Sequence, residues 1–142
     1  MKNLIYAISS GLLLALAWPT YGFPILLFFA FVPLLYAEFK VRNSEKKFIK
    51  WKVFGLAYLS FFLWNLITTY WIYYSTAFGG AFAILVNSLL MALVFMLYHI
   101  VAKRTGFSAA SAFLISIWMV FEKLHLAWEF SWPWLNLGNA FS

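Results

Sequence analysis

Five apolar segments, joined by short loops that carry almost all of the basic residues, determine what kind of protein this chain can be. Hydrophobic residues make up 65% of the 142 residues, and charged residues only 10%. A soluble domain needs charges at roughly a quarter of its positions to cover its surface. Because this chain cannot supply such a surface, its solvent must be lipid. The sequence therefore predicts an all-α integral membrane protein.

The five segments are expected to be transmembrane helices, and the first two to form a short hairpin. Their approximate ranges are 4–18, 24–39, 53–74, 81–101 and 107–128. Because a helix needs about 20 residues to cross roughly 30 Å of hydrocarbon, only the last three have a comfortable length. Pro33 lies inside the second segment and is expected to bend it, since proline removes a helix hydrogen bond. The hairpin turn is expected at 18–23.

The distribution of basic residues predicts that the N-terminus is cytoplasmic. With five crossings, nine of the ten basic residues fall on the cytoplasmic side, as the positive-inside rule requires, and only Lys123 falls outside. The nine are Lys2, Lys40, Arg42, Lys46, Lys47, Lys50, Lys52, Lys103 and Arg104. A cleaved signal peptide is the alternative for the start of the chain, but a second apolar run follows almost at once. The basic loop is expected to touch anionic lipid headgroups and not nucleic acid.

Several polar side chains are expected at membrane depth, where each needs a partner or a function. Asn65, Thr68 and Thr69 share one helix face, and Asn87 with Ser88 lies on the next segment. Hydrogen bonding between helices is the first explanation for them. The alternative is that they line a groove for lipid headgroups.

The fifth segment carries Trp118, Glu122, His125 and Glu129 at spacings that place all four on one stripe of a helix. A carboxylate at the depth of Glu122 must be paired, neutral or in a wet cavity. One interpretation is an interfacial ion pair with Lys123 or His125. The alternatives are a contact with a lipid headgroup or a polar wall of a substrate cavity. Only two histidines and no cysteines are present, so neither a metal site nor a cofactor is predicted.

Tryptophans gather where the apolar segments end on the predicted outer side. They are Trp18, Trp71, Trp128, Trp132 and Trp134. An aromatic belt at the membrane interface is the simplest explanation. The sequence Trp132-Pro133-Trp134 is more specific, because proline holds the two rings beside each other and suits a rigid lip where acyl chains enter from the bilayer.

Three groups of residues, taken in order, resemble the membrane part of the apolipoprotein N-acyltransferase family. They are Pro24-Ile25-Leu26 with Val32-Pro33-Leu34-Leu35; Tyr70-Trp71-Ile72 with Phe78-Gly79-Gly80 and Asn87; and Trp118, Glu122, Pro133, Trp134 and Gly138. The chain departs from the family pattern at His125, where the family commonly has arginine, and at Asn139, where it commonly has tyrosine. These two departures leave the headgroup contacts at both positions open.

The resemblance implies a bacterial inner-membrane, multi-pass protein that transfers an acyl chain from a phospholipid to the diacylglyceryl-cysteine of a lipoprotein. It implies that Trp71, Trp118, Glu122, Trp132 and Trp134 bind lipid or substrate. No catalytic residue is assigned, because the family's glutamate, lysine and cysteine belong to a nitrilase-like domain that residues 1–142 do not include. The chain is thus expected to be the N-terminal transmembrane region of such a protein, inactive by itself. The alternative is a small, non-enzymatic membrane partner or lipid-handling subunit.

Overall fold

The computed structural model describes residues 2–19, 21–44, 47–127 and 133–141, and all the secondary structure in these ranges is helical. The elements are α1 (Lys2–Leu16), η1 (Pro24–Leu26), α2 (Leu27–Ala30), α3 (Val32–Arg42), α4 (Ile49–Thr69), η2 (Tyr70–Tyr74), α5 (Ala77–Ala102), α6 (Phe107–Ala127), η3 (Pro133–Leu135) and η4 (Leu137–Phe141). The all-α prediction is confirmed.

Four helical units are long and apolar enough to cross a membrane. They are Pro24–Arg42, Ile49–Tyr74, Ala77–Ala102 and Phe107–Ala127. The remaining apolar helix, α1, has 15 residues and spans only about 22 Å at 1.5 Å per residue. Four to five crossings are therefore supported, and the fifth depends on α1.

The N-terminal segments form the expected hairpin, since α1 packs against α2 and α3. The expected bend also occurs, because the second segment is interrupted at Phe31, between α2 and α3, with Pro33 in the first turn of α3. The buried Ser10 hydroxyl on α1 donates a hydrogen bond of 2.6 Å to the Ala30 carbonyl beside the interruption. This bond joins α1 to the bend in the second segment.

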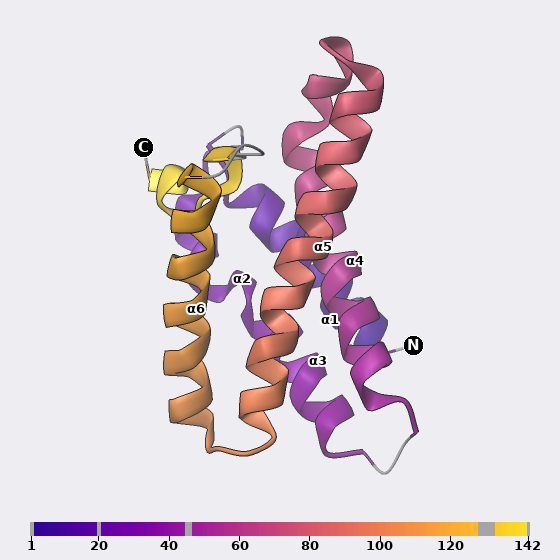
Figure 1. Ribbon diagram of the computed structural model, residues 1–142, viewed down its shortest axis with the longest axis vertical. Coiled ribbons are helices and arrows are strands. Elements are labelled where there is room, and N and C mark those ends of the chain that lie inside the picture. The colour runs from indigo at the N-terminus through magenta and orange to yellow at the C-terminus, as the bar shows by residue number, and fades with distance from the viewer. Residues whose placement is uncertain (1, 20, 45–46, 128–132, 142) are drawn as a thin grey trace.

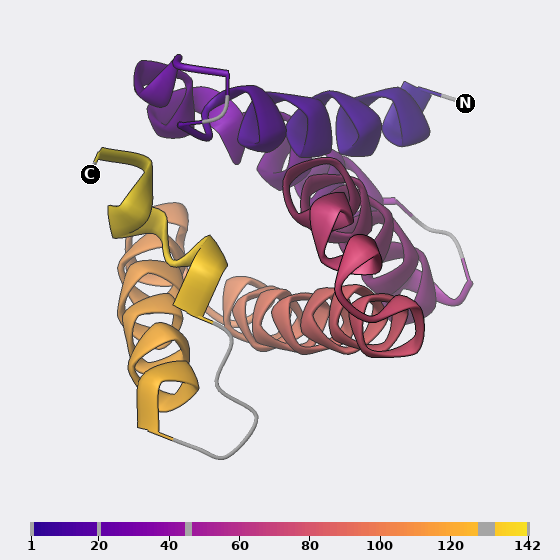
Figure 2. The ribbon, with the colours of Figure 1, turned by 90° about the horizontal axis from the view of Figure 1, so that it is seen from above.

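The helices are arranged as an open row that curves back on itself (Figures 1 and 2). Along this row α1 packs against α4, α4 against α5, and α5 against α6. Figure 2 shows η3 and η4 on the inner side of α6, facing the N-terminal hairpin. Phe141 of η4 reaches this hairpin, with its ring centroid 5.8 Å from that of Phe28. The C-terminal segment thereby helps to close the row.

Aromatic rings fill the centre of the curved row. Phe61 of α4 contacts Phe31, Phe95 and Trp118, which come from three other helical segments. Trp18 is also buried, with its ring centroid 5.6 Å from that of Trp64. The expectation that Trp18 belongs to an interfacial belt is therefore wrong, because its ring turns inward to fill the space beside α4.

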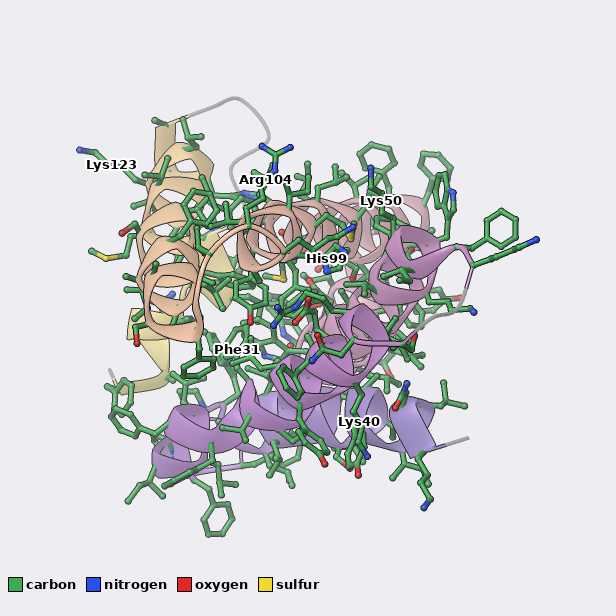
Figure 3. The ribbon with its side chains drawn as sticks, turned by 90° about the horizontal axis from the view of Figure 1, so that it is seen from below. Phe31, Lys40, Lys50, His99, Arg104 and Lys123 are labelled. Carbon is green, nitrogen blue, oxygen red and sulfur yellow. The ribbon has the colours of Figure 1, made fainter. Side chains whose placement is uncertain are left out.

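A buried polar cluster joins α3 to α5 at the end of the molecule that carries the basic residues. Glu38 Oε1 lies 2.6 Å from His99 Nδ1 and 3.0 Å from Arg42 Nε. Arg42 Nη1 also donates a 2.8 Å hydrogen bond to the Ala102 carbonyl, near the end of α5. Figure 3 shows His99 inside the bundle, whereas Lys40, Lys50, Arg104 and Lys123 lie towards its outside.

Candidate lipid-binding groove

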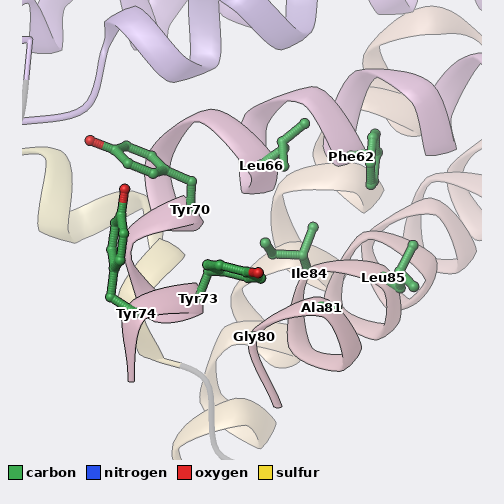
Figure 4. Close-up of a pocket in the computed structure, with 9 residues that line it drawn as sticks. All are labelled: Phe62, Leu66, Tyr70, Tyr73, Tyr74, Gly80, Ala81, Ile84 and Leu85. Atoms are coloured by element: carbon green, nitrogen blue, oxygen red, sulfur yellow. The ribbon is translucent and has the colours of Figure 1, made fainter. Parts of the chain in front are cut away.

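An apolar groove of about 400 Å³ lies at the far end of α4 and α5 from the basic residues (Figure 4). It is lined by residues of α4, η2 and α5, namely Phe62, Leu66, Tyr70, Tyr73, Tyr74, Gly80, Ala81, Ile84 and Leu85. This part of the helix pair extends above α6 in Figure 1. Such an apolar hollow on a lipid-facing helix pair has the chemistry to accept a hydrocarbon chain.

The turn between α4 and α5 shapes this groove. Thr76 caps α5 by accepting a 3.2 Å hydrogen bond from the backbone N–H of Gly79. A Cβ at Gly80 would lie 3.2 Å from the Tyr73 nitrogen and 3.3 Å from the Ile72 carbonyl carbon. Glycine at position 80 therefore lets η2 fold closely against the start of α5.

Three tyrosines give the groove a polar margin. Tyr70, Tyr73 and Tyr74 are all exposed. In Figure 4 the Tyr73 side chain points toward Ile84, while Tyr70 and Tyr74 point away from the groove. Because tyrosine combines an apolar ring with a hydroxyl, this arrangement suits the boundary between acyl chains and polar headgroups.

Two of the predicted site residues meet next to this turn. Trp71 of η2 and Trp134 of η3 pack edge to face, with ring centroids 5.7 Å apart and an interplanar angle of 89°. Both side chains remain exposed. The turn after α4 and the segment that begins at η3 are thus in contact, although 62 residues (positions 72 to 133) separate the two tryptophans.

Glu122 connects α6 to the C-terminal segment. Its Oε1 accepts a 3.0 Å hydrogen bond from the Trp118 indole N–H and a 2.7 Å bond from the backbone N–H of Leu137. The predicted stripe therefore does bring Trp118 and Glu122 together. The partners of Glu122 are not the expected Lys123 and His125, because the half-buried carboxylate turns toward η4.

The other predicted site residues have different surroundings. Trp118 is buried in the core, where its ring lies 5.1 Å from Phe31 and 5.4 Å from Phe61. His125 is buried with its ring against Phe121. Trp132, and with it the expected paired-ring lip, lies outside the described residues, as do Trp128 and Glu129.

The polar residues of α4 and α5 are used for packing. Asn87 Nδ2 donates a 2.7 Å hydrogen bond to Asn65 Oδ1, which joins the two helices as the first explanation expected. Thr68, Thr69 and Ser88 instead donate to carbonyls of their own helices. All five side chains are buried, which does not fit the alternative of a headgroup groove.

Sequence reasoning used Tyr70 only as part of the family resemblance, assigned no binding role to the groove tyrosines, and did not select the Glu38 and His99 pair. Three tyrosines at the end of an apolar run were an available signal for an interfacial site. Glu38 stands four residues before Arg42, which is the spacing of a helix ion pair. His99, which lies 61 positions after Glu38, completes the cluster, but nothing in the sequence indicates this contact.

Within the described ranges no group of three or more histidine, aspartate or glutamate side chains is arranged to hold a metal ion.

Two comparisons with known proteins point to the same family. A family model described as the apolipoprotein N-acyltransferase N-terminal domain matches residues 10–142. An apolipoprotein N-acyltransferase of Chlorobaculum tepidum is 30% identical over 142 residues, which is 98% of this chain and 26% of that protein. The chain thus spans about a quarter of the relative's length. No solved structure matches it.

Proposed function

This chain belongs to the apolipoprotein N-acyltransferase family, and we propose that it forms the part of such an enzyme that holds lipid in the bacterial inner membrane. The acyl donor is a phospholipid, and the acceptor is the N-terminal diacylglyceryl-cysteine of a lipoprotein. The chain contains no cysteine, so the nucleophile for acyl transfer has to lie outside these 142 residues. The role of this segment is binding and positioning.

The single observation that carries the proposal is the tyrosine-edged apolar groove beside the Trp71 and Trp134 pair. An acyl chain fits the wall made by Phe62, Leu66 and Ile84. The ester and headgroup then lie at the tyrosine end of the groove, where Tyr73 is the tyrosine that points into it, at the depth where amphipathic rings are stable. Holding a chain end in this way restricts the motion of the carbonyl that must meet the nucleophile, which is how positioning lowers a reaction barrier.

The predicted site residues contribute to lipid binding in different ways, some next to the groove and some indirectly. They are Trp71, Trp134 and Glu122. Trp71 is part of the turn that bears the tyrosines, and Trp134 packs on it. Glu122 acts indirectly, because its bond to Leu137 holds the segment that presents Trp134. Trp118 supports Glu122 from the core. We also propose that Trp132 contributes to the lip, because it precedes Pro133 and Trp134 in the sequence.

Photolabelling tests the groove directly. The purified chain is incorporated into phospholipid nanodiscs that contain a phosphatidylethanolamine with a photoreactive group in one acyl chain. Labelled peptides are then mapped by mass spectrometry. We expect labels concentrated on residues 62–85, which contain every residue of the groove wall.

Matched variants distinguish a groove from general lipid exposure. Ala81→Trp fills the groove and is expected to reduce labelling of residues 62–85 at least fivefold. Leu93→Trp places the same ring at another exposed position of α5 outside the groove and is expected to leave labelling unchanged. Uniform labelling of all exposed helix faces, or equal effects of the two variants, would rule out a specific acyl site here.

A further inference from the structure

A second groove lies at the opposite end of α4, where the chain is basic. It has a volume of about 270 Å³ and is lined by α1, α3 and the first turns of α4, through Asn3, Leu4, Val41, Trp51, Lys52, Gly55 and Leu56. The tyrosine-edged groove begins at Phe62 on the same helix, so the two hollows use different residues throughout. Nothing in the proposed acyl-transfer role requires this second groove.

The lining of the second groove has two kinds of surface. Leu4, Val41 and Leu56 supply an apolar wall, and the indole of Trp51 is 73% exposed beside them. Lys52 and Asn3 supply polar groups, of which the lysine ammonium carries a charge. An apolar trough next to a cation is the pattern that an anionic amphiphile requires, with its acyl chain in the trough and its phosphate at the ammonium.

Gly55 keeps the hollow open. A Cβ built at this position meets no atom within 4 Å. The space beside Gly55 is therefore free, and no neighbouring helix packs tightly against it. This differs from Gly11, where a Cβ would lie 2.5 Å from the Ser60 carbonyl oxygen. Gly55 therefore contributes volume to the groove without being required for helix packing.

The charge around the groove favours an anion. Lys2 precedes Asn3, and Lys47 and Lys50 are exposed close to Lys52 in the chain. Glu38, the acidic side chain on the neighbouring α3, is buried and already bonded to Arg42 and His99. Lys40 is directed over the rings of Tyr36 and Tyr6, at 4.8 and 5.4 Å, and so belongs to a separate contact.

We propose that this groove, defined by Asn3, Leu4, Val41, Trp51, Lys52, Gly55 and Leu56, binds one anionic glycerophospholipid at the basic end of the protein. The phosphate contacts Lys52 and Asn3, and one acyl chain lies along Leu4, Val41 and Leu56 beside Trp51. A lipid bound there fastens the N-terminus of α1 to the start of α4 at the membrane interface.

Native mass spectrometry in detergent tests the proposal. The purified chain is titrated with phosphatidylglycerol or with phosphatidylcholine of the same acyl chains. We expect one phosphatidylglycerol to be retained at concentrations at which phosphatidylcholine is lost. Equal retention of the two lipids would overturn the proposal.

Three variants locate the lipid. Lys52→Gln is expected to weaken phosphatidylglycerol retention about fivefold, the factor for one cation near an anionic surface. Gly55→Leu fills the trough and is expected to weaken it about tenfold or more. Lys103→Gln removes an exposed cation from the same end of the molecule, outside the groove, and is expected to change nothing.

The outcomes distinguish a specific lipid-binding site from general electrostatic attraction to anionic lipid. An equal loss in Lys103→Gln and Lys52→Gln would show only general electrostatic binding and would overturn the proposal. An excess of inorganic phosphate is expected not to displace the lipid, and displacement would mean that the phosphate group alone is bound. Circular dichroism checks that each variant is folded. If Gly55→Leu does not fold, the Lys52→Gln variant, at an exposed position, tests the lipid site by itself.

Discussion

At the scale of single residues, Glu122 shows how a carboxylate is accommodated within an apolar chain. It is half-buried, and its Oε1 accepts from both the Trp118 indole and the Leu137 backbone. These bonds satisfy an oxygen of a polar group whose burial in an apolar surrounding would otherwise be costly. They also connect a core tryptophan to the segment that carries Trp134.

Replacing Glu122 is expected to release this segment. Glu122→Ala leaves two N–H groups without an acceptor and is expected to cost about 1–3 kcal/mol. Hydrogen exchange at the Leu137 amide, followed in detergent by mass spectrometry, is expected to accelerate accordingly. Glu122→Gln keeps an acceptor oxygen and is expected to have a smaller effect.

Lys123→Ala is the control for this prediction, because Lys123 is an exposed neighbour on the same helix. An unchanged exchange rate at Leu137 in Glu122→Ala would mean that the segment is held by its apolar contacts. The buried side chains of Leu135 and Ala140 would then be the candidates.

At the scale of helices, α1 and α4 approach each other closely at Gly11. Gly11 faces α4 so closely that a Cβ would lie 2.5 Å from the Ser60 carbonyl oxygen and 3.0 Å from Leu63 Cβ. Small residues at such crossings let backbones pack closely, which is a main source of helix association in lipid. The short helix α1 depends on this contact.

Gly11→Ala is therefore expected to separate α1 from α4. Overpacking of this kind costs about 1–3 kcal/mol, which a lower unfolding midpoint in detergent will report. Gly55→Ala on α4 is the matched control, because its new methyl group meets open space and alanine is the better helix former by roughly 1 kcal/mol. Equal effects of the two variants would contradict a tight α1 and α4 crossing.

The buried cluster of Glu38, Arg42 and His99 holds α3 against α5 in a different way. Glu38→Ala leaves the buried His99 and the part-buried Arg42 without their shared acceptor, and a buried donor left unsatisfied costs about 1–3 kcal/mol. The measurement is the free energy of unfolding in detergent. Arg104→Ala, which removes an exposed cation at the same end, is expected to change it by less than about 0.5 kcal/mol. A loss below 1 kcal/mol for Glu38→Ala would show that the cluster does not stabilise the fold.

At the scale of the whole molecule, the ends of the helices differ in chemistry. Basic residues flank the ends of α3 and α5 and the starts of α1 and α4, and aromatic residues fill the turn of η2 and the start of η3. This asymmetry is what the positive-inside rule and the interfacial preference of aromatic rings lead one to expect.

Reporter fusions test the membrane orientation of the chain that this asymmetry predicts. Fusions after Arg42 and after Arg104 are expected to give cytoplasmic signals, and fusions after Gly79 and after Ser142 periplasmic ones. The reason is that five crossings with a cytoplasmic N-terminus would place nine of the ten basic residues on the cytoplasmic side. A periplasmic signal after Arg42 would contradict the predicted topology of the first two segments.

Acyl transfer by residues 1–142 alone is expected to be absent, because the chain has no cysteine to form a thioester. The purified chain is incubated with phospholipid and a synthetic diacylglyceryl-cysteine peptide, and the product is measured by mass spectrometry. An active apolipoprotein N-acyltransferase serves as the positive control. Detectable N-acylated peptide above the protein-free background would disprove this expectation.

Long-range contacts explain where the sequence-based predictions were incomplete. The spacing of Trp118 and Glu122 predicts that they meet, because four residues is a local distance on a helix. The Leu137 bond to Glu122 lies outside this pattern, since it depends on how the chain returns after α6. For the same reason the Glu38 and His99 pair had no signal in the sequence, and Trp18 was expected at the interface although it fills the core.

The sequence by itself determined the helical membrane class, the kinked hairpin and the two chemically different ends. These follow from local composition, because lipid requires every backbone group to be satisfied within its own helix. Only the tertiary structure decided that Trp71 meets Trp134, that η2 walls a groove and that Glu122 holds the C-terminal segment. These features depend on which helix faces come together, and in an almost uniformly apolar chain the hydrophobic pattern does not distinguish one face from another.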